Sequence, residues 1–371
     1  MIRVVATFLA LVLVGCTTPY RPPVSEFGAP KFPGILDTLK GSASGEVDVI
    51  AVHGMCTHDE TWAKTRIMEI RNAIAGSSES ISDVKFATTT LNDGLVAVGQ
   101  SYRVPQGIVN FTAIVWSPMT TGLKQQLIYD KTATPTDCSS TADCSPVRAT
   151  LNGNLKDGLL NDCLADALIY QGTSKKVISN AMSQALRQVV SNGSRRSSPI
   201  VLITESLGSK VAFDALLSLL ENPSDSDTLR PALDRLAVIF MQANQLPILS
   251  LADQMAGPVD ELRGFGSRTS APDALQMLLQ ARDDGLRGAA VSKIFVVAFT
   301  DPNDLLSYRL VPSRYNGPGV TIANVLVSNS NTLFGWIERP DAAHTGYGLN
   351  PIVTKLIACG QYAIPVNQCS Q

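Results

Sequence analysis

Short runs of apolar, β-branched residues alternate along most of the chain with longer segments that carry apolar residues at helical spacing. The runs predict buried strands over residues 47–52, 84–90, 109–116, 199–203, 236–241, 294–299 and 320–327. The longer segments predict helices over residues 62–74, 155–169, 177–190, 210–220, 274–281 and 352–359. Buried strands that alternate with helices form parallel sheets covered on both faces. The sequence therefore predicts an α/β fold with a mainly parallel central sheet and helices on both faces.

A different pattern opens the chain, where Arg3 precedes an almost unbroken apolar run over residues 4–14. This run is too short for a helix to cross the roughly 30 Å hydrocarbon core of a bilayer, and it has the length of a signal-peptide core. It ends in Leu13-Val14-Gly15-Cys16, which resembles the bacterial lipobox. The resemblance implies that residues 1–15 are a lipoprotein signal peptide and that Cys16 is lipidated. An ordinary signal peptide that is cleaved nearby, with Cys16 incidental, is the alternative.

Composition divides the rest of the chain into a tether and a folded domain. Residues 17–32 are rich in Pro, Ser and Thr, and we therefore expect residues 16–45 to form an acylated N-terminus and a tether. Residues 46–371 fit one domain with a polar insertion at about residues 132–153. No later segment offers the roughly 18 consecutive apolar residues of a membrane span, so the mature chain is not expected to cross the membrane.

The lipobox-like cysteine also implies a location. It predicts a protein that is held in the cell envelope, on a membrane, through lipidated Cys16. Thr17 rather than aspartate follows this cysteine, which indicates the periplasmic face of the outer membrane. The formal net charge of −2 gives no long-range attraction to nucleic acid or anionic lipid, so no nucleic-acid partner is expected.

Six cysteines remain when Cys16 is set aside, and an even number suits an oxidising compartment. Spacing favours local pairs, and the predicted disulfides are Cys138–Cys144, Cys359–Cys369 and Cys56–Cys163. Because six cysteines allow 15 connectivities, this pairing is a preference among open alternatives. The chain has three histidines and no CxxC motif, so we expect no metal site.

The strongest chemical motif is Thr204-Glu205-Ser206-Leu207-Gly208, which lies between a predicted strand and a predicted helix. This is the setting of a nucleophile elbow, in which a sharp turn presents the serine hydroxyl above the sheet. The N–H of Leu207, at the start of the helix, can then face a developing oxyanion. Thr204 departs from the Gly-x-Ser-x-Gly form. Capping of the helix by Ser206 or Thr204 is the alternative.

A second motif, His53-Gly54-Met55, follows the first predicted strand. It resembles the His-Gly segment of lipases and related esterases of the α/β-hydrolase superfamily, whose loop supplies a second oxyanion N–H. The resemblance assigns that role to the N–H of Met55 and makes His53 a residue that orients the loop. A simple turn at the end of a strand is the alternative.

The chain order of these hydrolases, Ser, then Asp or Glu, then His, leaves one histidine. His53 and His58 precede Ser206, so His344 is the candidate base. The acid is expected after the strand at residues 294–299, where Asp304 is favoured and Asp301 is the alternative.

The resemblance covers residues 47–359 and implies the α/β-hydrolase fold of a lipase/esterase-like serine hydrolase. Its substrate would be a carboxylic ester, with lipids among the candidates, and it would need no cofactor. Acyl transfer to another acceptor, amide hydrolysis and a non-catalytic binding lipoprotein on the same scaffold remain as alternatives. Residues 161–167 and 241–245 also resemble segments of bacterial members, but beyond helix packing and a strand exit the sequence gives them no physical role.

Overall fold

A computed structural model describes residues 16–26, 28, 30–76, 78–132, 147–190, 197–221, 230–254, 271–285, 293–315, 317–361 and 369. The strands are β1 (Cys16–Thr17), β2 (Val24–Ser25), β3 (Glu46–Val52), β4 (Ala87–Thr90), β5 (Val96–Val104), β6 (Gly107–Val115), β7 (Ile200–Glu205), β8 (Leu236–Gln242), β9 (Ile294–Thr300), β10 (Val320–Leu326) and β11 (Thr332–Leu333). The helices are α2 (Ile35–Lys40), α3 (Glu60–Ala75), α4 (Pro118–Lys124), α5 (Thr150–Asn154), α6 (Ala165–Gln171), α7 (Lys175–Val190), α8 (Gly208–Glu221), α10 (Leu246–Leu249), α11 (Ala274–Gly285), α12 (Pro340–Thr345) and α13 (Pro351–Cys359). Short 3-10 turns cover Ile81–Asp83, Asn92–Gly94, Gln125–Asp130, Ser250–Asp253 and Pro312–Arg314.

The described residues build a nine-stranded mixed sheet in the order β2-β10-β9-β8-β7-β3-β6-β5-β4. The six strands from β10 to β6 run parallel to one another, and β2, β5 and β4 extend the edges as antiparallel strands. β7 lies at the centre of the order. Because β7 to β10 run in parallel, their carboxyl ends meet at one edge of the sheet, which is where open α/β sheets place their sites.

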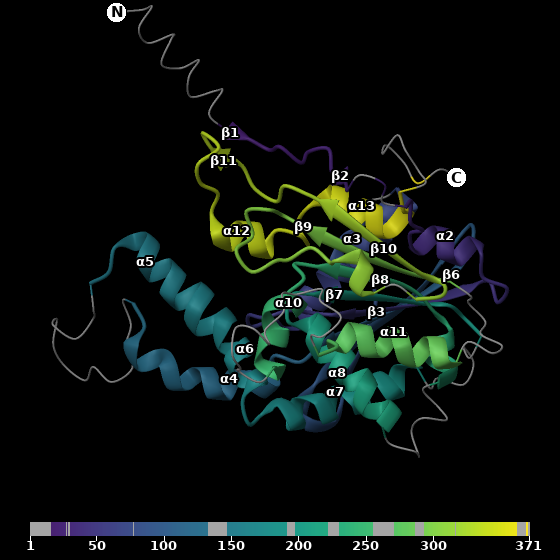
Figure 1. Cartoon of the computed structure of the whole chain (residues 1–371), viewed down its shortest axis with the longest axis horizontal. Coiled ribbons are helices and arrows are strands. Elements are labelled where there is room, and N and C mark those ends of the chain that lie inside the picture. Colours follow the sequence, from purple (N-terminus) through teal and green to yellow (C-terminus); the bar gives the residue numbers. More distant parts are fainter. Residues whose placement is uncertain are drawn as a thin grey trace, which may run out of the picture.

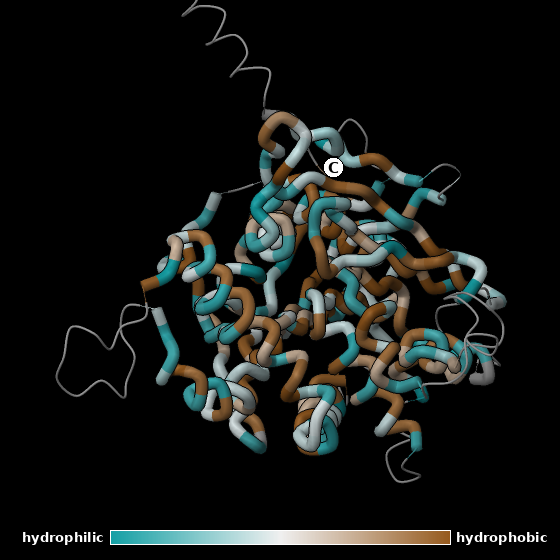
Figure 2. Tube along the Cα trace, turned by 60° about the vertical axis from the view of Figure 1, so that its left-hand side comes forward, coloured by the Kyte–Doolittle hydropathy of each residue, from teal (hydrophilic) through white to brown (hydrophobic). Residues whose placement is uncertain are grey.

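Helices cover both faces of the sheet. α2, α3 and α13 lie on one face, and α7, α8 and α11 lie on the other (Figure 1). Each face buries its own apolar core, and the hydrophobic stretches of the chain gather along the strands between the helices (Figure 2). The predicted α/β class, with a mainly parallel sheet and helices on both faces, is confirmed.

The structure also holds elements that the apolar pattern did not predict. β5 is missing from the prediction because Gly99, Gln100, Ser101 and Arg103 interrupt its apolar positions. The strand forms nonetheless, since it pairs along its whole length with β6 across a tight connection. The strand predicted over residues 84–90 is shorter than expected and begins at Ala87.

The N-terminal boundary of the domain must be corrected, because part of the expected tether is folded. β1 pairs with β11, β2 pairs with β10, and Phe32 and α2 belong to the core beside α13. Phe32, Ile35, Leu36 and Leu39 are all buried. These four apolar residues follow helical spacing, a local signal that the surrounding Pro, Ser and Thr residues obscured.

The region after α4 differs from the prediction in form. The helix expected over residues 155–169 is a π-helical segment, Leu155–Leu164, followed by α6. The predicted polar insertion at residues 132–153 lies mostly outside the described residues. The predicted signal peptide and the predicted pair Cys138 and Cys144 lie wholly outside them. Among the helices that the structure describes, none is both long and apolar enough to cross a membrane.

Candidate active site

Ser206 lies in a sharp turn between β7 and α8 at the centre of the sheet. Its φ angle is 50°, in the left-handed region that non-glycine residues rarely adopt and that persists only where the surroundings hold it. One restraint is the Ser206 N–H, which donates to the carbonyl oxygen of Gln242 at the end of β8 over 2.7 Å. The strand-turn-helix context predicted for Ser206 is therefore present.

Two glycines let this turn approach the neighbouring loop. A Cβ on Gly208 would collide with the carbonyl oxygen of His53, and one on Gly54 would lie 2.7 Å from the Cβ of Ser206. Thr204, which departs from the Gly-x-Ser-x-Gly form, is buried, and its hydroxyl lies 2.8 Å from that of Ser209. A threonine therefore fits because its hydroxyl finds a partner inside the turn.

The structure brings Ser206, His344 and Asp304 together in one chain of hydrogen bonds. Nε2 of His344, in α12, lies 3.0 Å from the Ser206 hydroxyl. Nδ1 of the same ring lies 2.9 Å from Oδ1 of Asp304. All three residues are buried, with exposed fractions of 4–6%. An imidazole whose Nδ1–H is held by a carboxylate presents Nε2 as an acceptor for the serine proton.

Asp301, the alternative acid, does not contact His344 in the structure. Its carboxylate accepts from the backbone N–H groups of Asn303, over 3.0 Å, and Asn329, over 2.6 Å. Burial raises the pKa of Asp301, and Glu338 lies beside it. Burial and the charge of Asp301 together raise the pKa of Glu338 to about 6. Asp301 thus organises the loops behind the site.

Tyr347 is a residue that the sequence did not single out. Its hydroxyl donates to Oδ2 of Asp304 over 3.1 Å and accepts from the backbone N–H of Asp301 over 2.7 Å. The backbone N–H of Leu306 adds a further bond to Asp304, over 3.0 Å. These donors fix the carboxylate that holds His344. The only signal for Tyr347 was its position three residues after His344, just beyond the end of α12.

The predicted oxyanion groups flank Ser206. Met55 is buried at the cavity wall, and Leu207 is buried at the start of α8. Within the described part of the chain, neither backbone N–H has a hydrogen-bond acceptor. Buried N–H groups without a partner are rare in native proteins. Met55 lines the cavity, whereas Leu207 directly follows the cavity residue Ser206.

His53 anchors the loop that carries Met55. Its Nε2 accepts from the N–H groups of Trp116, over 2.9 Å, and Ser117, over 3.2 Å, and its Nδ1 lies 2.7 Å from the Gly54 carbonyl oxygen. The ring also stacks on Trp116 with the centroids 5.2 Å apart. Burial, followed by the neighbouring His58, lowers the pKa of His53 well below its usual value. The ring is therefore neutral, and both of its nitrogens are used in hydrogen bonds that hold the loop.

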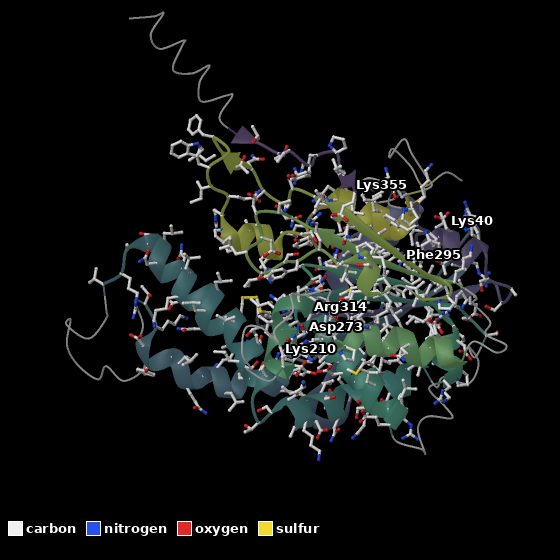
Figure 3. The ribbon with its side chains drawn as sticks, viewed as in Figure 1. Lys40, Lys210, Asp273, Phe295, Arg314 and Lys355 are labelled. Atoms are coloured by element: carbon white, nitrogen blue, oxygen red, sulfur yellow. A yellow bond between two sulfur atoms is a disulfide. The ribbon has the colours of Figure 1, made fainter. Side chains whose placement is uncertain are left out.

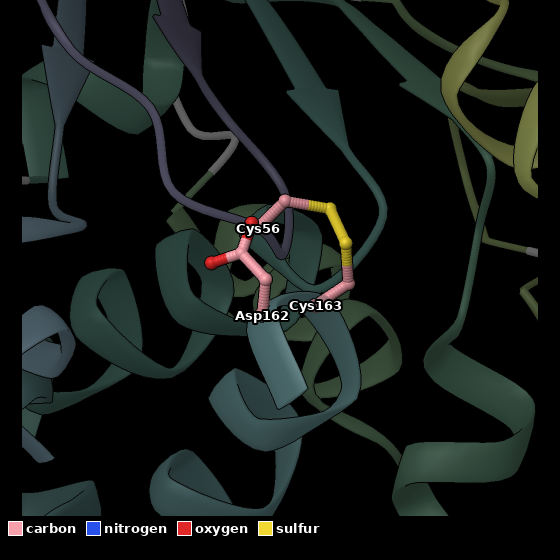
Figure 4. A group of neighbouring side chains, drawn as sticks. All are labelled: Cys56, Asp162 and Cys163. Atoms are coloured by element: carbon pink, nitrogen blue, oxygen red, sulfur yellow. A yellow bond between two sulfur atoms is a disulfide. The ribbon is translucent and has the colours of Figure 1, made fainter. Parts of the chain in front are cut away.

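A disulfide between Cys56 and Cys163 joins this loop to the end of the π-helical segment (Figure 4). Asp162 lies beside it and accepts from the hydroxyl of Thr57 over 2.5 Å and from Nζ of Lys124 over 2.9 Å. The sulfurs are joined to each other, so this cluster offers no thiolate to a metal ion. The segment at residues 161–167 thus has a physical role, since Asp162 and Cys163 fasten the loop that carries Met55.

The second disulfide joins Cys359, at the end of α13, to Cys369. Both predicted pairs that fall within the described residues, Cys56–Cys163 and Cys359–Cys369, are therefore confirmed.

A cavity of about 320 Å³ opens beside Ser206 and His344. Its lining includes the apolar residues Met55, Trp62 and Leu349 and the charged residues Arg66, Glu69 and Glu205. The guanidinium of Arg66 donates to Glu205, to Glu69 over 3.2 Å and to the Gly348 carbonyl oxygen over 3.3 Å. The carboxylates offset the charge of Arg66, so this wall is polar without carrying a net positive charge. Glu205 stands in the motif around Ser206, but nothing in the sequence indicated a role for Glu205, Arg66 or Glu69.

Ion pairs on the other side of the nucleophile hold α8. Lys210, labelled in Figure 3, is almost fully buried in the first turn of this helix. Its ammonium donates to Asp214 over 3.0 Å and pairs with Asp253 over 2.9 Å. The hydroxyl of Tyr170 also donates to Asp214, over 2.9 Å. This network fixes the helix whose N-terminus carries Ser206 and Leu207.

Comparison with known proteins adds no family assignment. No protein-family model, curated protein or solved structure matches the chain.

Proposed function

We propose that the protein is a serine hydrolase of the lipase/esterase-like part of the α/β-hydrolase superfamily and that it cleaves a carboxylic ester. The observation that carries the proposal is the hydrogen-bonded series from the Ser206 hydroxyl through His344 to Asp304, placed at the wall of a cavity. A buried serine turned toward a histidine that is held by a carboxylate is the arrangement that activates a hydroxyl for nucleophilic attack.

The proposed reaction runs through an acyl-enzyme. Oγ of Ser206 attacks the ester carbonyl carbon while Nε2 of His344 takes the hydroxyl proton. The same proton then passes to the alcohol as the carbon–oxygen bond breaks, leaving the acyl group on Ser206. Water attacks that ester, again giving its proton to His344, and the acid leaves as Ser206 recovers its proton. Asp304 stabilises the imidazolium at both stages and holds its tautomer.

In each tetrahedral intermediate the former carbonyl oxygen carries negative charge, which hydrogen-bond donors must stabilise. The backbone N–H groups of Met55 and Leu207 supply them in this proposal, supported by their burial and by their lack of other acceptors in the described residues. Loss of one such donor slows comparable enzymes by about 10²–10³. Because His53 and the Cys56–Cys163 disulfide fix the loop of Met55, this donor is held before substrate arrives.

The direct test is hydrolysis of p-nitrophenyl esters of increasing acyl length by purified protein. Ser206→Ala is expected to abolish hydrolysis of every ester that the wild type cleaves. Ser209→Ala is the matched control, because its hydroxyl lies three residues along the same turn and contacts Thr204 rather than His344. Full activity in Ser206→Ala refutes the nucleophile. Release of the acyl group to an added alcohol faster than to water indicates acyl transfer instead.

The acyl length at which activity is greatest sharpens the substrate class. A cavity of about 320 Å³ with an apolar part formed by Met55, Trp62 and Leu349 suits a small or medium acyl group. Activity that rises steadily to long chains contradicts this size and favours a substrate that extends out of the cavity.

We further propose that the chain is a lipoprotein of the cell envelope, anchored through acylated Cys16. The support is the short apolar run that ends at Gly15 and Cys16. Cys16→Ser is expected to leave the precursor uncleaved or to release the protein from the membrane fraction. Unchanged processing and fractionation of this variant contradict the anchor without touching the proposed chemistry.

A further inference from the structure

Four large apolar side chains stand exposed on one short hairpin, which we call the apolar tip: Leu333, Phe334, Trp336 and Ile337. Trp336 is 93% exposed and the other three are 51–58% exposed. Single exposed apolar residues are normal on protein surfaces, but a contiguous group marks a site of interaction.

The backbone of the hairpin holds these side chains outward. The N–H of Leu333 donates to the carbonyl oxygen of Ile337 over 2.8 Å, and that of Trp336 donates to Leu333 over 3.0 Å. Phe334 and Gly335 both have positive φ angles, 53° and 70°, as in the tight turns that close two-residue hairpins. A bulky aromatic residue is disfavoured in this conformation. Local geometry therefore presents the tip to the surroundings instead of burying it.

The tip lies next to the proposed attachment point of the chain. Cys16 is the Cα partner of Leu333 in the β1–β11 pair, and the Thr332 hydroxyl donates to the Thr17 carbonyl oxygen over 3.1 Å. β1 and β11 stand together at the top of the molecule (Figure 1), where Figure 2 shows a hydrophobic loop.

The tip and the strand paired with it carry almost no charge themselves, and the Arg339–Asp341 ion pair just beyond the tip is neutral as a pair. Across residues 16–25 and 329–337 the only ionisable charged side chain is that of Arg21. The two segments therefore bring no carboxylate to an anionic headgroup, and little charge has to be desolvated when the tip leaves water. Tryptophan beside aliphatic residues suits the boundary between headgroups and acyl chains.

We propose that the apolar tip inserts into the lipid bilayer beside Cys16 and thereby fixes the orientation of the protein on the membrane. A lipid surface is the occupant favoured by the pairing of Cys16 with Leu333, because an acyl group on Cys16 enters the bilayer at that position. This choice of occupant rests on the proposed anchor. The exposure of the four side chains and the backbone geometry of the tip are observed independently of that anchor.

Docking of the tip would also place the candidate active site near the membrane. The hairpin leads within three residues into α12, which carries His344, and Thr345 of the same helix lines the cavity. A tip held in the bilayer therefore keeps one wall of the cavity close to the membrane surface.

The test is quenching of tryptophan fluorescence by lipids that carry bromine on their acyl chains. Full protein, purified from the envelope of the bacterium that produces it, is reconstituted into vesicles of phosphatidylethanolamine and phosphatidylglycerol with and without brominated lipid. The emission that is present in the wild type and absent in Trp336→Phe is expected to be shifted to the blue and mostly lost on bromination. Trp116, which is fully buried, remains in both proteins as an internal reference.

A matched control moves the tryptophan to the opposite side of the molecule. Val177 in α7 is 58% exposed, as is Ile337, and α7 lies at the other end of the view from β11 (Figure 1). Val177→Trp in the Trp336→Phe background is expected to escape quenching. Equal quenching at both positions indicates adsorption without orientation and overturns the proposal.

Two further results also overturn the proposal. One is emission from Trp336 that bromination does not change. The other is a change from dimer to monomer in Trp336→Ser, because a second copy then covers the tip. The mass of the N-terminal peptide reports acylation separately. Quenching of Trp336 in protein that lacks an acyl chain therefore refutes the anchor but supports docking of the tip.

Discussion

His53, in the loop after β3, and His344, in α12, are both buried near the carboxyl edge of the same sheet, but their ring nitrogens have different partners. Both nitrogens of His53 bond to backbone groups, those of Gly54, Trp116 and Ser117, and the Ser117 hydroxyl lies further off, 3.4 Å from Nε2. One nitrogen of His344 bonds to a carboxylate and the other to a hydroxyl at a cavity wall. The first region is a closed scaffold, whereas the second has a side that substrate can reach.

The contrast teaches that burial alone does not separate a structural histidine from a chemical one. His53 is fully buried and His344 is 6% exposed. What separates them is whether a proton can move from a partner to the ring. Two backbone N–H groups, which keep their protons, already occupy Nε2 of His53, and neither His53 nor Ser117 lines the cavity. The Ser206 hydroxyl, in contrast, can lose its proton to His344 once attack on an electrophile begins. The following predictions test this difference.

The largest effect is expected at the cavity wall, where Ser206 and His344 lie. Ser206→Ala and His344→Ala should each lower kcat by a factor of about 10⁴ or more, because the two side chains act as one unit. The double variant should be scarcely worse than either single variant. Steady-state kinetics on the best p-nitrophenyl ester, with circular dichroism to check the fold, measure both points. Losses that multiply in the double variant contradict a shared role.

The next effect separates the two aspartates. Asp304→Asn should lower kcat by a factor of about 10²–10⁴ with a smaller change in KM, because the ring loses the carboxylate that holds its tautomer. Asp301→Asn should retain most of its kcat and lose stability, because its partners are the backbone N–H groups of Asn303 and Asn329. The reverse ranking of the two kcat values overturns the assignment of the acid but leaves Ser206 and His344 in place.

At His53 we expect a loss of stability rather than a direct loss of catalysis. His53→Ala should lower the free energy of unfolding by about 3 kcal/mol, because buried amides lose their acceptor and the ring leaves a cavity. His58→Ala is the control, since His58 stacks on His53 but is only partly buried. Urea unfolding with the disulfides intact measures both variants. A His53→Ala protein that is as stable as the wild type but has lost hydrolase activity contradicts the purely structural role of His53.

The smallest effect concerns the dependence of stability on pH. The contributions of Glu338 and of His53 to the free energy of unfolding change in opposite directions as the pH rises. Burial and Asp301 raise the pKa of Glu338 from 4.5 to about 6. The folded state therefore binds this proton more tightly, and the stability it contributes is present below pH 4.5 and lost as the pH rises through 6. The lowered pKa of His53 acts oppositely, because its contribution is lost as the pH falls below 6.5.

Glu338→Gln isolates the first of these contributions. The difference in unfolding free energy, wild type minus variant, should fall by at most about 2 kcal/mol as the pH rises through this range. Urea unfolding at a series of pH values measures the difference. A difference that increases with pH contradicts the interpretation of Glu338.

Local signals in the sequence predicted much of the fold and of the candidate site. The parallel strands are continuous apolar runs, and Ser206 stands in a short motif between one of these runs and a helix. His344 followed from the chain order and from the presence of only three histidines. The choice between Asp304 and Asp301 stayed open because both follow β9 within four residues, and only the turn after that strand decides which carboxylate faces the ring.

Other features depend on contacts between distant segments. Tyr347 matters because its loop returns to Asp301 and Asp304, more than forty residues away. β5 forms because β6 pairs with it, and the segment around Phe32 is folded because α13 and the sheet cover it. The exposure of Trp336 cannot be inferred from an apolar sequence, since the same residues could equally well have been buried. Apart from the helical spacing of the apolar residues at 32–39, spacing along the chain gives no indication of these contacts.

Activation of Ser206 by His344 can be measured with a fluorophosphonate probe. Only an activated serine reacts with such a reagent, and its phosphorus remains bonded to Oγ. Incubation of folded protein with the probe, followed by peptide mass mapping, is expected to place one adduct on Ser206. The same adduct should be lost in His344→Ala and retained in Ser209→Ala. An unlabelled Ser206 in folded wild-type protein, or equal labelling in His344→Ala, contradicts the account.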